Sequence, residues 1–455
     1  MNKKFIYIGV SALMLSTGLV SCNDLDTQPL NNYVTSEEKA EAISAQPELA
    51  AAGVVGIPSS YTPYGAVYSS AHCDFGWPAV LFFMDCIGPD LVSRDAGYNW
   101  FSVSGEYNLG TNNNYLNNLS WRHGYKIIKA ANDVIANIDP ETTDPSLQLY
   151  AAQGYGNRAY IYFMLAQLFQ KTYVGNESLP CVPIITDKNS NDASGGIDRS
   201  SVKEVYDQVL SDIDMAIKFL SECGLGVDKI ADVGLKRFIS LGTAYGIRAR
   251  VNLVMNNWQA AADDAKNAIL KSGATPYSIA EASQPAFASS DDHNCMWAVY
   301  IQPNDRVVTT GICNWPSMIG SFNSNGYWTV TSRMISKSLW AQIPESDCRK
   351  GWWIDENLKS PNLSEAQQSL INSIAPEAYQ QVKIGPYQGV VGTTTNSNDV
   401  PLMRVEEMYL IQAEATAMAG DVAGGKQILE NFVTTYRNPS YVCQATTKEA
   451  VQDAV

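Results

Sequence analysis

The sequence predicts a mostly α-helical protein in which a scaffold of paired helices is interrupted by long irregular insertions that carry short strands. Three observations predict this fold class. The stretch from Val400 to Arg437 holds two apolar patterns of helical period, separated by Gly420-Asp421. A similar pair recurs from Leu241 to Gly273. Residues from about 61–118 and 284–389 lack this period and are rich in Gly, Asn, Asp and aromatic residues.

The two pairs predict tetratricopeptide-like hairpins. In the second pair, Ala249 fits the first small position of that repeat, and the aromatic and small positions that follow are Trp258, Ala261, Ala265 and Ala268. Small residues at these positions let two helix backbones approach closely. The two copies are far apart in the chain, so we expect non-repetitive sequence between them rather than a tandem array.

Further helices precede the second pair. Thr35 and Glu38 form a capping box, as do Ser201 and Glu204, so a helix should begin at each place. A helix is also predicted from about Leu119 to Ile138, where the stripe that contains Trp121 is interpreted as packing. Another should span Asn157 to Tyr173, and the loop after it, residues 175–200, should be irregular because it contains Pro and Gly.

The first residues are typical of an export signal. Lys3 and Lys4 precede an apolar run from Phe5 to Val20, and Leu19-Val20-Ser21-Cys22 closes it. This end resembles a bacterial lipoprotein signal, with residues 1–21 removed, Cys22 lipidated and residues 22–34 serving as a tether. The alternative is an ordinary secretion signal with an incidental cysteine. No later stretch is long and apolar enough to span a bilayer.

Composition argues against several classes of function. The net charge is −15, and no basic stripe with interleaved aromatics is present, so nucleic-acid binding is not expected. The eight cysteines after Cys22 form no CxxC pair, which argues against structural zinc, and their spacing leaves disulfide pairing open. No EF-hand spacing supports calcium in an acidic loop such as Asp291-Asp292. We expect no cofactor and no metal.

Catalytic motifs are also missing. The three histidines make no HExxH spacing, and no GxSxG elbow or P-loop occurs. A surface glycosidase remains the rival hypothesis, because a pair of carboxylates can be chosen from the 46 acidic residues. However, Glu406, Glu407 and Glu414 fall on a predicted scaffold helix. We therefore predict a protein that is not an enzyme.

Three segments together resemble one known family. Residues 401–415 (PLMRVEEMYLIQAEA), the Arg158-Ala159 helix (RAYIYFML) and residues 121–132 (WRHGYKIIKAAN) are similar, in order and spacing, to the signature helices of the SusD/RagB family of surface glycan-binding lipoproteins. With the lipoprotein start, the resemblance covers nearly the whole chain. It implies one SusD-like domain over residues 35–455, C-terminally incomplete because members usually continue beyond the last hairpin.

The resemblance also implies a function. Family members sit at the outer membrane on the cell surface, bind oligosaccharide or polysaccharide, and deliver it to a SusC-like, TonB-dependent β-barrel transporter. Membrane contact would be made through the lipid anchor only. A non-glycan nutrient such as peptide is the alternative cargo. A pure helical-repeat adaptor would fit the hairpins but not the aromatic-rich insertions.

The insertions supply the candidate ligand-binding residues. Aromatic rings stack on the apolar faces of sugars, while Asn, Asp and Arg side chains bind the hydroxyls. The sequence has 10 Trp and 24 Tyr, so only those without a helical period are informative. The candidates are Trp77, Arg94, Asp95, Tyr98, Asn99, Trp100, Trp315, Tyr327 and Trp328. Trp297 lies in a strand-like run, 296–302, and is expected in the core.

Overall fold

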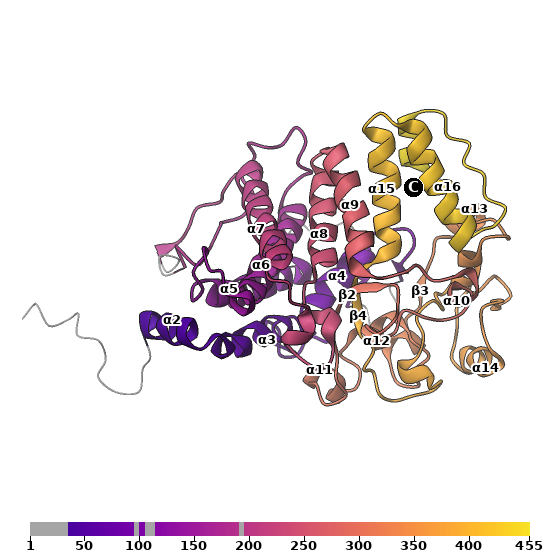
Figure 1. Ribbon diagram of the computed structural model, residues 1–455. Coiled ribbons are helices and arrows are strands. Elements are labelled where there is room, and N and C mark those ends of the chain that lie inside the picture. The colour runs from indigo at the N-terminus through magenta and orange to yellow at the C-terminus, as the bar shows by residue number, and fades with distance from the viewer. Residues whose placement is uncertain (1–34, 95–99, 105–113, 191–194) are drawn as a thin grey trace, which may run out of the picture.

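A computed structural model describes residues 35–94, 100–104, 114–190 and 195–455. A row of upright helices crosses the upper part of Figure 1 from α7 to α16, and the short helices of the second insertion fill the lower right. The mostly α-helical prediction is confirmed. None of the described helices combines the length and apolar character that crossing a bilayer requires.

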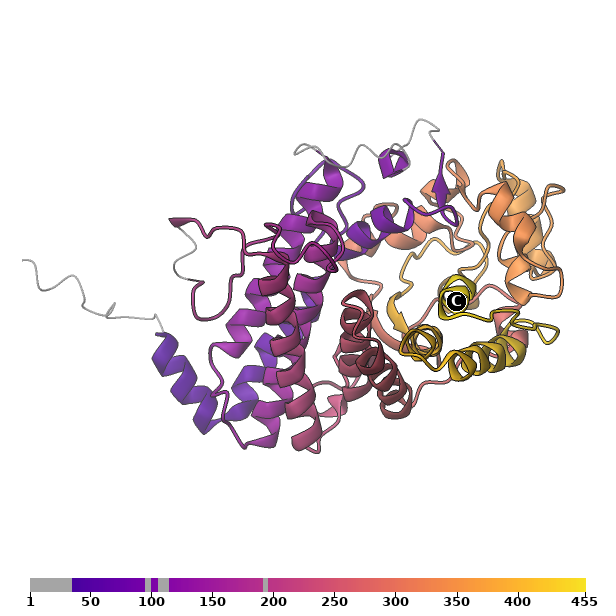
Figure 2. The same cartoon turned by 90° about the horizontal axis from the view of Figure 1, so that it is seen from above.

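Three helical hairpins form the scaffold, and from above they follow one another in an arc (Figure 2). They are α6 (Pro145–Phe169) with α7 (Val202–Glu222), α8 (Leu241–Val254) with α9 (Trp258–Ser272), and α15 (Val405–Met418) with α16 (Val422–Tyr436). Helix α15 packs against α9, so the last two hairpins are neighbours despite their separation in sequence. The predicted small positions are fully buried, and a Cβ on Gly425 would lie only 2.5 Å from the carbonyl oxygen of Ala413.

The two helix starts predicted from capping boxes are confirmed, whereas the helix predicted from Asn157 begins earlier, at Pro145. Helix α2 (Ser36–Ala45) begins after Thr35, whose hydroxyl accepts the Glu38 N–H at 3.1 Å. Ser201 caps α7 in the same way. Helix α5 (Tyr115–Ile135) packs against α6, but the interpretation of its whole stripe as packing is wrong at Trp121, which is 37% exposed because it lies at the rim of a groove. Before α5 come η1 (Pro47–Ala50) and α3 (Ala51–Ser59).

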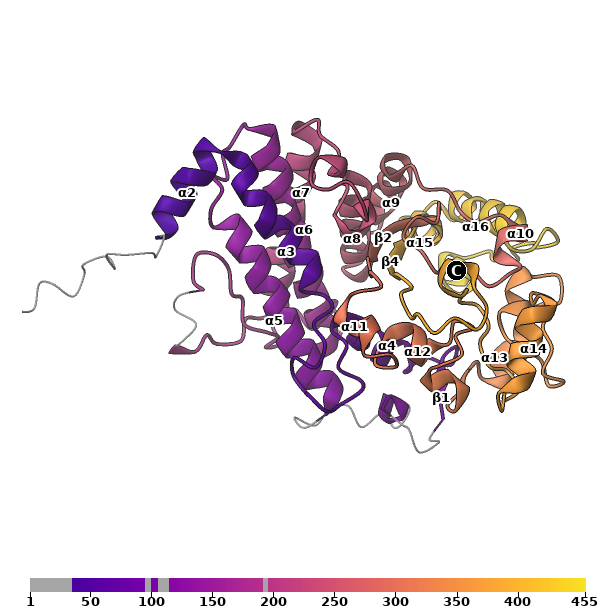
Figure 3. The same cartoon turned by 90° about the horizontal axis from the view of Figure 1, so that it is seen from below.

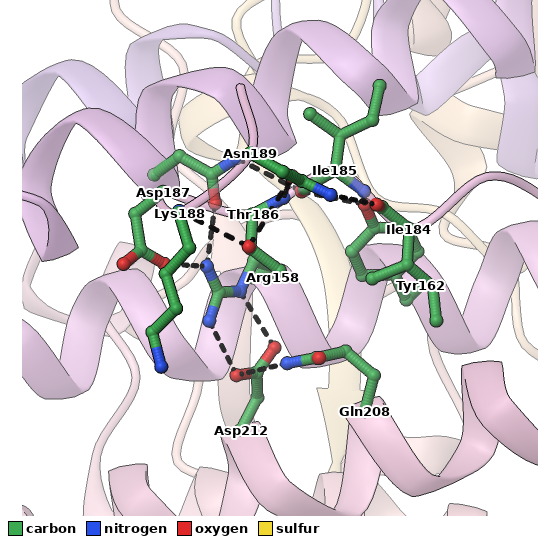
Figure 4. Close-up of polar contacts among 11 residues, drawn as sticks. Arg158, Tyr162, Ile184, Ile185, Thr186, Asp187, Lys188, Asn189, Gln208 and Asp212 are labelled. Atoms are coloured by element: carbon green, nitrogen blue, oxygen red, sulfur yellow. Dashed lines mark hydrogen bonds and ion pairs between the residues drawn. The ribbon is translucent and has the colours of Figure 1, made fainter. Parts of the chain in front are cut away.

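Arg158 on α6 fixes the loop that joins α6 to α7 (Figure 4). Its guanidinium donates to both carboxylate oxygens of Asp212 on α7, at 2.7 and 2.8 Å, and to Asp187 in the loop at 2.7 Å. It also donates to the side-chain oxygen of Asn132 on α5 at 2.7 Å. One buried cation thus ties two neighbouring helices and the loop to α6, and its charge is fully partnered.

The insertions contain more helix than the sequence predicted. Helix α4 (Trp77–Asp85) lies in the first insertion, after Gly76, whose φ of 85° brings the chain close to Tyr61. The expectation of irregular structure there was wrong because α4 is apolar on all sides and has no period to detect. Other short elements are η2 (Ser102–Ser104), α10 (Ile279–Ala282), α11 (Arg306–Thr309), α12 (Trp315–Ile319), η6 (Tyr327–Thr329), α13 (Lys337–Gln342), η7 (Cys348–Trp352), α14 (Glu365–Ser373) and η8 (Tyr387–Gly389).

Two small antiparallel sheets bring distant segments together. Strand β2 (Cys295–Val299) pairs with β4 (Val400–Arg404), with Val299 opposite Val400. The prediction of a helix from Val400 was therefore wrong for its first five residues, which form the buried strand that leads into α15. Strand β1 (Val92–Ser93) pairs with β3 (Arg333–Met334) and joins the two insertions. The remaining elements are η4 (Val227–Lys229), η5 (Leu235–Arg237) and α17 (Lys448–Ala454).

Candidate functional site

Five ring side chains from the two insertions meet in one place, and Tyr68, His72, Trp100, Tyr115 and Tyr327 are together called the aromatic cluster. The rings of His72 and Trp100 are stacked, with centroids 5.5 Å apart and 27° between their planes. Trp100 meets Tyr115 edge-on at 6.1 Å, and Tyr115 meets Tyr68 edge-on at 5.0 Å. The cluster therefore joins the two aromatic-rich insertions of the sequence.

The hydroxyl of Tyr327 is the polar centre of the cluster. It accepts a hydrogen bond from Trp100 Nε1 at 3.3 Å and is hydrogen-bonded to His72 Nδ1. Tyr327 is only 6% exposed, whereas Tyr68, His72, Trp100 and Tyr115 are half-buried. Tyr327 thus supports the cluster from within, and the other four rings present surface to solvent.

Tyr327 is positioned by α12. Its backbone N–H donates to the Ser317 hydroxyl on α12 at 3.0 Å. Asn314 caps α12 by accepting the Ser317 N–H at 3.0 Å. Figure 3 places α12 beside α4, between α11 and α13, and α12 contacts α4. The second insertion therefore reaches the cluster on a short, capped and supported helix.

Asp74 positions the loop that carries Tyr68 and His72. Its carboxylate accepts the backbone N–H groups of Val67 and Tyr68, at 2.7 and 2.8 Å, and lies 2.9 Å from Nε2 of His123 on α5. Burial pushes the pKa of Asp74 upward, but the hydrogen bonds from His123 and the two backbone groups outweigh it, so the pKa lies below its usual value. Asp74 is thus held as a carboxylate that ties the loop to the scaffold.

Two of the tryptophans predicted as ligand contacts lie in the core instead. Trp77 is 0% exposed and donates from Nε1 to the Tyr160 hydroxyl at 3.4 Å. Trp328 is 2% exposed, packs against Phe322 and donates to Asn323 Oδ1 at 2.6 Å. Rings buried to this degree offer no face for a sugar. Trp297 is buried, as expected.

The other predicted residues are dispersed. Trp315 is 9% exposed and faces a cleft rather than the aromatic cluster. Arg94 is exposed and pairs with Glu377 at 2.6 Å. Asp95, Tyr98 and Asn99, and Cys22 with the rest of residues 1–34, lie outside the described residues. Of the six predicted ligand contacts that lie within the described residues, the structure brings Trp100 and Tyr327 together in the aromatic cluster.

A cleft runs beside α12, and its two parts share Asp85, Trp315 and Pro401 in their walls. The outer hollow has a volume of about 550 Å³ and is bounded by α4, α6, α8, β4 and α15. Across it, Arg250 binds Glu407 through two hydrogen bonds of 2.6 and 2.5 Å. The inner hollow, of about 260 Å³, reaches Phe287, Lys383 and Arg404.

Sequence reasoning missed His72, Tyr68 and Tyr115 as members of the cluster. The sequence offers His72 no second histidine at the spacing of a metal site, so His72 was not predicted as a site residue. Tyr68 and His72 lie in the run YGAVYSSAHC, where small and polar residues leave ring side chains without a helical face to join. That composition is the signal that could have selected them.

Comparison with known proteins bears on this architecture. Residues 85–233 match the family model SusD-like_3, described as starch-binding and associating with the outer membrane. A SusD-like carbohydrate-binding protein from Bacteroides vulgatus superposes with a TM-score of 0.71 at 20% identity, over 93% of this chain and 79% of that one. The chain has the SusD-like fold.

Other solved structures share the SusD-like fold. A putative sugar-binding protein from Bacteroides vulgatus has a TM-score of 0.64 at 20% identity, over 90% of this chain and 82% of that one. Surface glycan-binding protein A from Bacteroides uniformis has a TM-score of 0.62 at 16% identity, over 90% and 84%. No curated protein matches the sequence. The identities show the fold of this SusD-like protein and leave its ligand to be argued from its own residues.

Proposed function

We propose that this SusD-like protein captures an oligosaccharide or polysaccharide at the cell surface through the aromatic cluster, without cleaving it. The observation that carries the proposal is the half-buried ring of Trp100, which two insertions hold in place. Trp100 and its neighbours supply ring surface for the apolar face of a sugar, and His72 supplies a polar group beside them. Rings that are already ordered lose little conformational entropy on binding.

The flanking residues extend this proposal. Arg94 is exposed and follows strand β1 in the first insertion, so its guanidinium is available to sugar hydroxyls if it leaves Glu377. Asp95, Tyr98 and Asn99 stand between Arg94 and Trp100 in the sequence and remain predicted contacts. Trp315 is proposed to act in the central cleft rather than in the cluster.

Delivery and anchoring form a second part of the proposal. The captured glycan is handed to a SusC-like, TonB-dependent transporter in the outer membrane. Residues 1–21 are removed, Cys22 carries the lipid, residues 22–34 form the tether, and residues 35–455 form one SusD-like domain. Support comes from the family description and from the Leu19-Val20-Ser21-Cys22 motif. Cys22→Ala should move the protein from the membrane fraction to the soluble fraction of cells.

Retention on polysaccharide gels tests the glycan proposal. The protein from about residue 24 onward is run on gels that contain different polysaccharides, and the products are analysed in parallel. Trp100→Ala should weaken retention by at least about ten-fold, or ~1.4 kcal/mol. Trp258→Ala, which removes a half-buried ring at the start of α9, is the matched control and should change nothing.

Three results would contradict the proposal. Released oligosaccharide would indicate an enzyme. Equal retention of the Trp100 variant and the unmodified protein would remove the cluster from the site. Binding of peptides together with no retention on any polysaccharide would replace the glycan by a peptide cargo.

A further inference from the structure

The inner hollow of the central cleft holds two cations that lack carboxylate partners. Lys383 Nζ lies over the ring of Trp352, 4.5 Å from its centroid, and 5.2 Å from the centroid of Phe287. The Arg404 guanidinium lies over Phe287 at 4.5 Å. Among the described residues, neither side chain has an ion-pair partner within 4.0 Å. Both are half-buried, so water compensates them only in part.

Two carboxylates lie in the same hollow. Asp85 ends α4 and Asp90 follows it, and both help to line the hollow with Lys383 and Arg404. Neither carboxylate forms an ion pair with either cation in the described structure, although both act on the charge of Lys383. Burial, and then Arg404, lower the pKa of Lys383 to about 7 against the attraction of Asp90 and Asp85. Both Asp85 and Asp90 are exposed, so water reaches their carboxylates.

This arrangement is unfavourable for Lys383. Elsewhere in the same cleft, Arg250 is neutralised by a bidentate contact with Glu407. A lysine that loses water without gaining a partner lowers the free energy of unfolding, and an apolar side chain would fill the same space at lower cost. The indole nitrogen of Trp353, which also lines the hollow, is a buried donor without an acceptor. The hollow thus offers several polar groups that the protein itself does not satisfy.

A ligand that satisfies these groups has a definite chemistry. A carboxylate is required for Lys383 and Arg404, and hydroxyls suit the carboxylates of Asp85 and Asp90. A neutral sugar would leave both cations unpaired. A multiply charged anion such as phosphate would be repelled by the two carboxylates. The volume of about 260 Å³ is on the scale of a single sugar residue rather than a longer segment.

We propose that the inner hollow binds the carboxylate of an acidic sugar residue through Lys383 and Arg404, so that this protein prefers uronic-acid-containing glycans. The inference rests on the proposed glycan-binding function and names its substrate class. The hydroxyls of the same sugar are bound by Asp85 and Asp90. Trp315, which lines both hollows, connects this sugar to the chain in the outer hollow.

Calorimetry with acidic oligosaccharides and their carboxyl-reduced forms tests the inference. The probes are oligosaccharides of polygalacturonate, alginate and glucuronoxylan, each paired with its neutral, reduced counterpart. At least one acidic probe should bind ten-fold or more tightly than its reduced form. Lys383→Met should abolish that preference. Lys337→Met, at an exposed lysine near Glu356, should preserve it.

The stability of the variant separates binding from a structural role. Lys383→Met should fold and melt at a temperature equal to or above that of the unmodified protein, because the lysine lacks a partner. A fall in melting temperature would show that Lys383 supports the fold, and would overturn the inference. Equal affinity for acidic and reduced probes would also overturn it, as would a preference that survives Lys383→Met.

The outcomes distinguish this inference from the proposed function. If neutral polysaccharides are retained through Trp100 but no acidic preference exists, only the inference fails. If no glycan binds at all, both fail. A dipeptide that binds in a Lys383-dependent manner, in place of every acidic oligosaccharide, would assign the hollow to an amino-acid carboxylate and reject the sugar.

Discussion

Arg158 in the helical scaffold and Lys383 in the insertions are both cations with restricted access to water, but within the part of the chain that the structure describes only Arg158 of the two has carboxylate partners. Arg158 binds Asp212, Asp187 and Asn132 at 2.7–2.8 Å. Lys383 faces two aromatic rings and a hollow. Arg248 on α8 is partnered in the same way as Arg158, since it binds the carboxylates of Asp264 and Asp214. In the scaffold, charge fixes the positions of helices, whereas in the inner hollow we propose that it serves a ligand.

The largest effect is expected from breaking the scaffold network. Arg158→Met leaves Asp212 buried without its cation and releases Asp187 in the loop, so the free energy of unfolding should fall by roughly 3–5 kcal/mol. Denaturant titration measures the change. Lys129→Met, which breaks an exposed pair with Asp133 on α5, should cost less than about 0.5 kcal/mol. Similar losses in the free energy of unfolding for Arg158→Met and Lys129→Met would contradict the structural role assigned to the buried Arg158 network.

Asp74→Asn tests whether a partnered charge also matters where an insertion joins the scaffold. The amide oxygen cannot serve both His123 and the backbone N–H groups of Val67 and Tyr68, so stability should fall by about 2 kcal/mol near pH 7. The folded-state pKa of Asp74 is depressed, so its contribution is present above the unfolded value of about 3.9 and is lost as pH falls through the lower folded value. The two proteins should therefore converge in acid. A difference that does not depend on pH would argue against the carboxylate as the cause.

Lys383→Met should raise the free energy of unfolding, whereas the two preceding substitutions should lower it. The pKa of Lys383 is lowered to about 7 in the folded protein, so below pH 7 its ammonium is charged in both states and carries the full cost of burial. We expect the variant to be more stable by on the order of 1 kcal/mol at pH 6. As pH rises from about 7 towards 10.4, the folded lysine is neutral and the gain should shrink. Denaturant titration across this pH range, with Lys337→Met as the control, measures the gain in stability at pH 6 and its decrease at higher pH.

The smallest effect concerns the hydroxyl at the centre of the aromatic cluster. Tyr327→Phe keeps the ring but removes the acceptor for Trp100 Nε1 and the contact with His72. Glycan affinity should fall a few-fold, about 0.5–1.5 kcal/mol, with little change in stability. Tyr387→Phe removes the hydroxyl of a half-buried tyrosine outside the cluster, which accepts a hydrogen bond from Gln388, and is the matched control. An unchanged affinity would mean that the rings are ordered without Tyr327.

The scaffold was predictable from sequence because its signals are local. The capping boxes at Thr35 and Ser201, the small residues from Ala249 to Ala268, and the turn at Gly420-Asp421 each act within a few residues. Strand β4 was missed for the opposite reason. Its conformation depends on pairing with β2, about a hundred residues earlier in the chain, and its sequence suits a buried helix equally well.

The candidate site was only partly predictable. Composition identified the two insertions, and Trp100 and Tyr327 do meet, but nothing local distinguishes them from Trp77 and Trp328. Trp328 is buried because Phe322 and Asn323 surround it, and Trp77 because it begins a helix that no period reveals. The sequence could not show that Lys383 lacks an ion-pair partner, because its surroundings come from six separate segments that enclose one hollow.

Helix α12 has a consequence for the length of chain that this protein selects. Its first residue, Trp315, lines the central cleft, and its Ser317 holds Tyr327 in the aromatic cluster. Under the proposed function, these two places on one short helix would act as a bivalent receptor, since the second contact is made at high effective concentration once the first has formed. A polymer that reaches both would be held far longer than a fragment that reaches one, so short breakdown products would leave readily while intact chains stay bound.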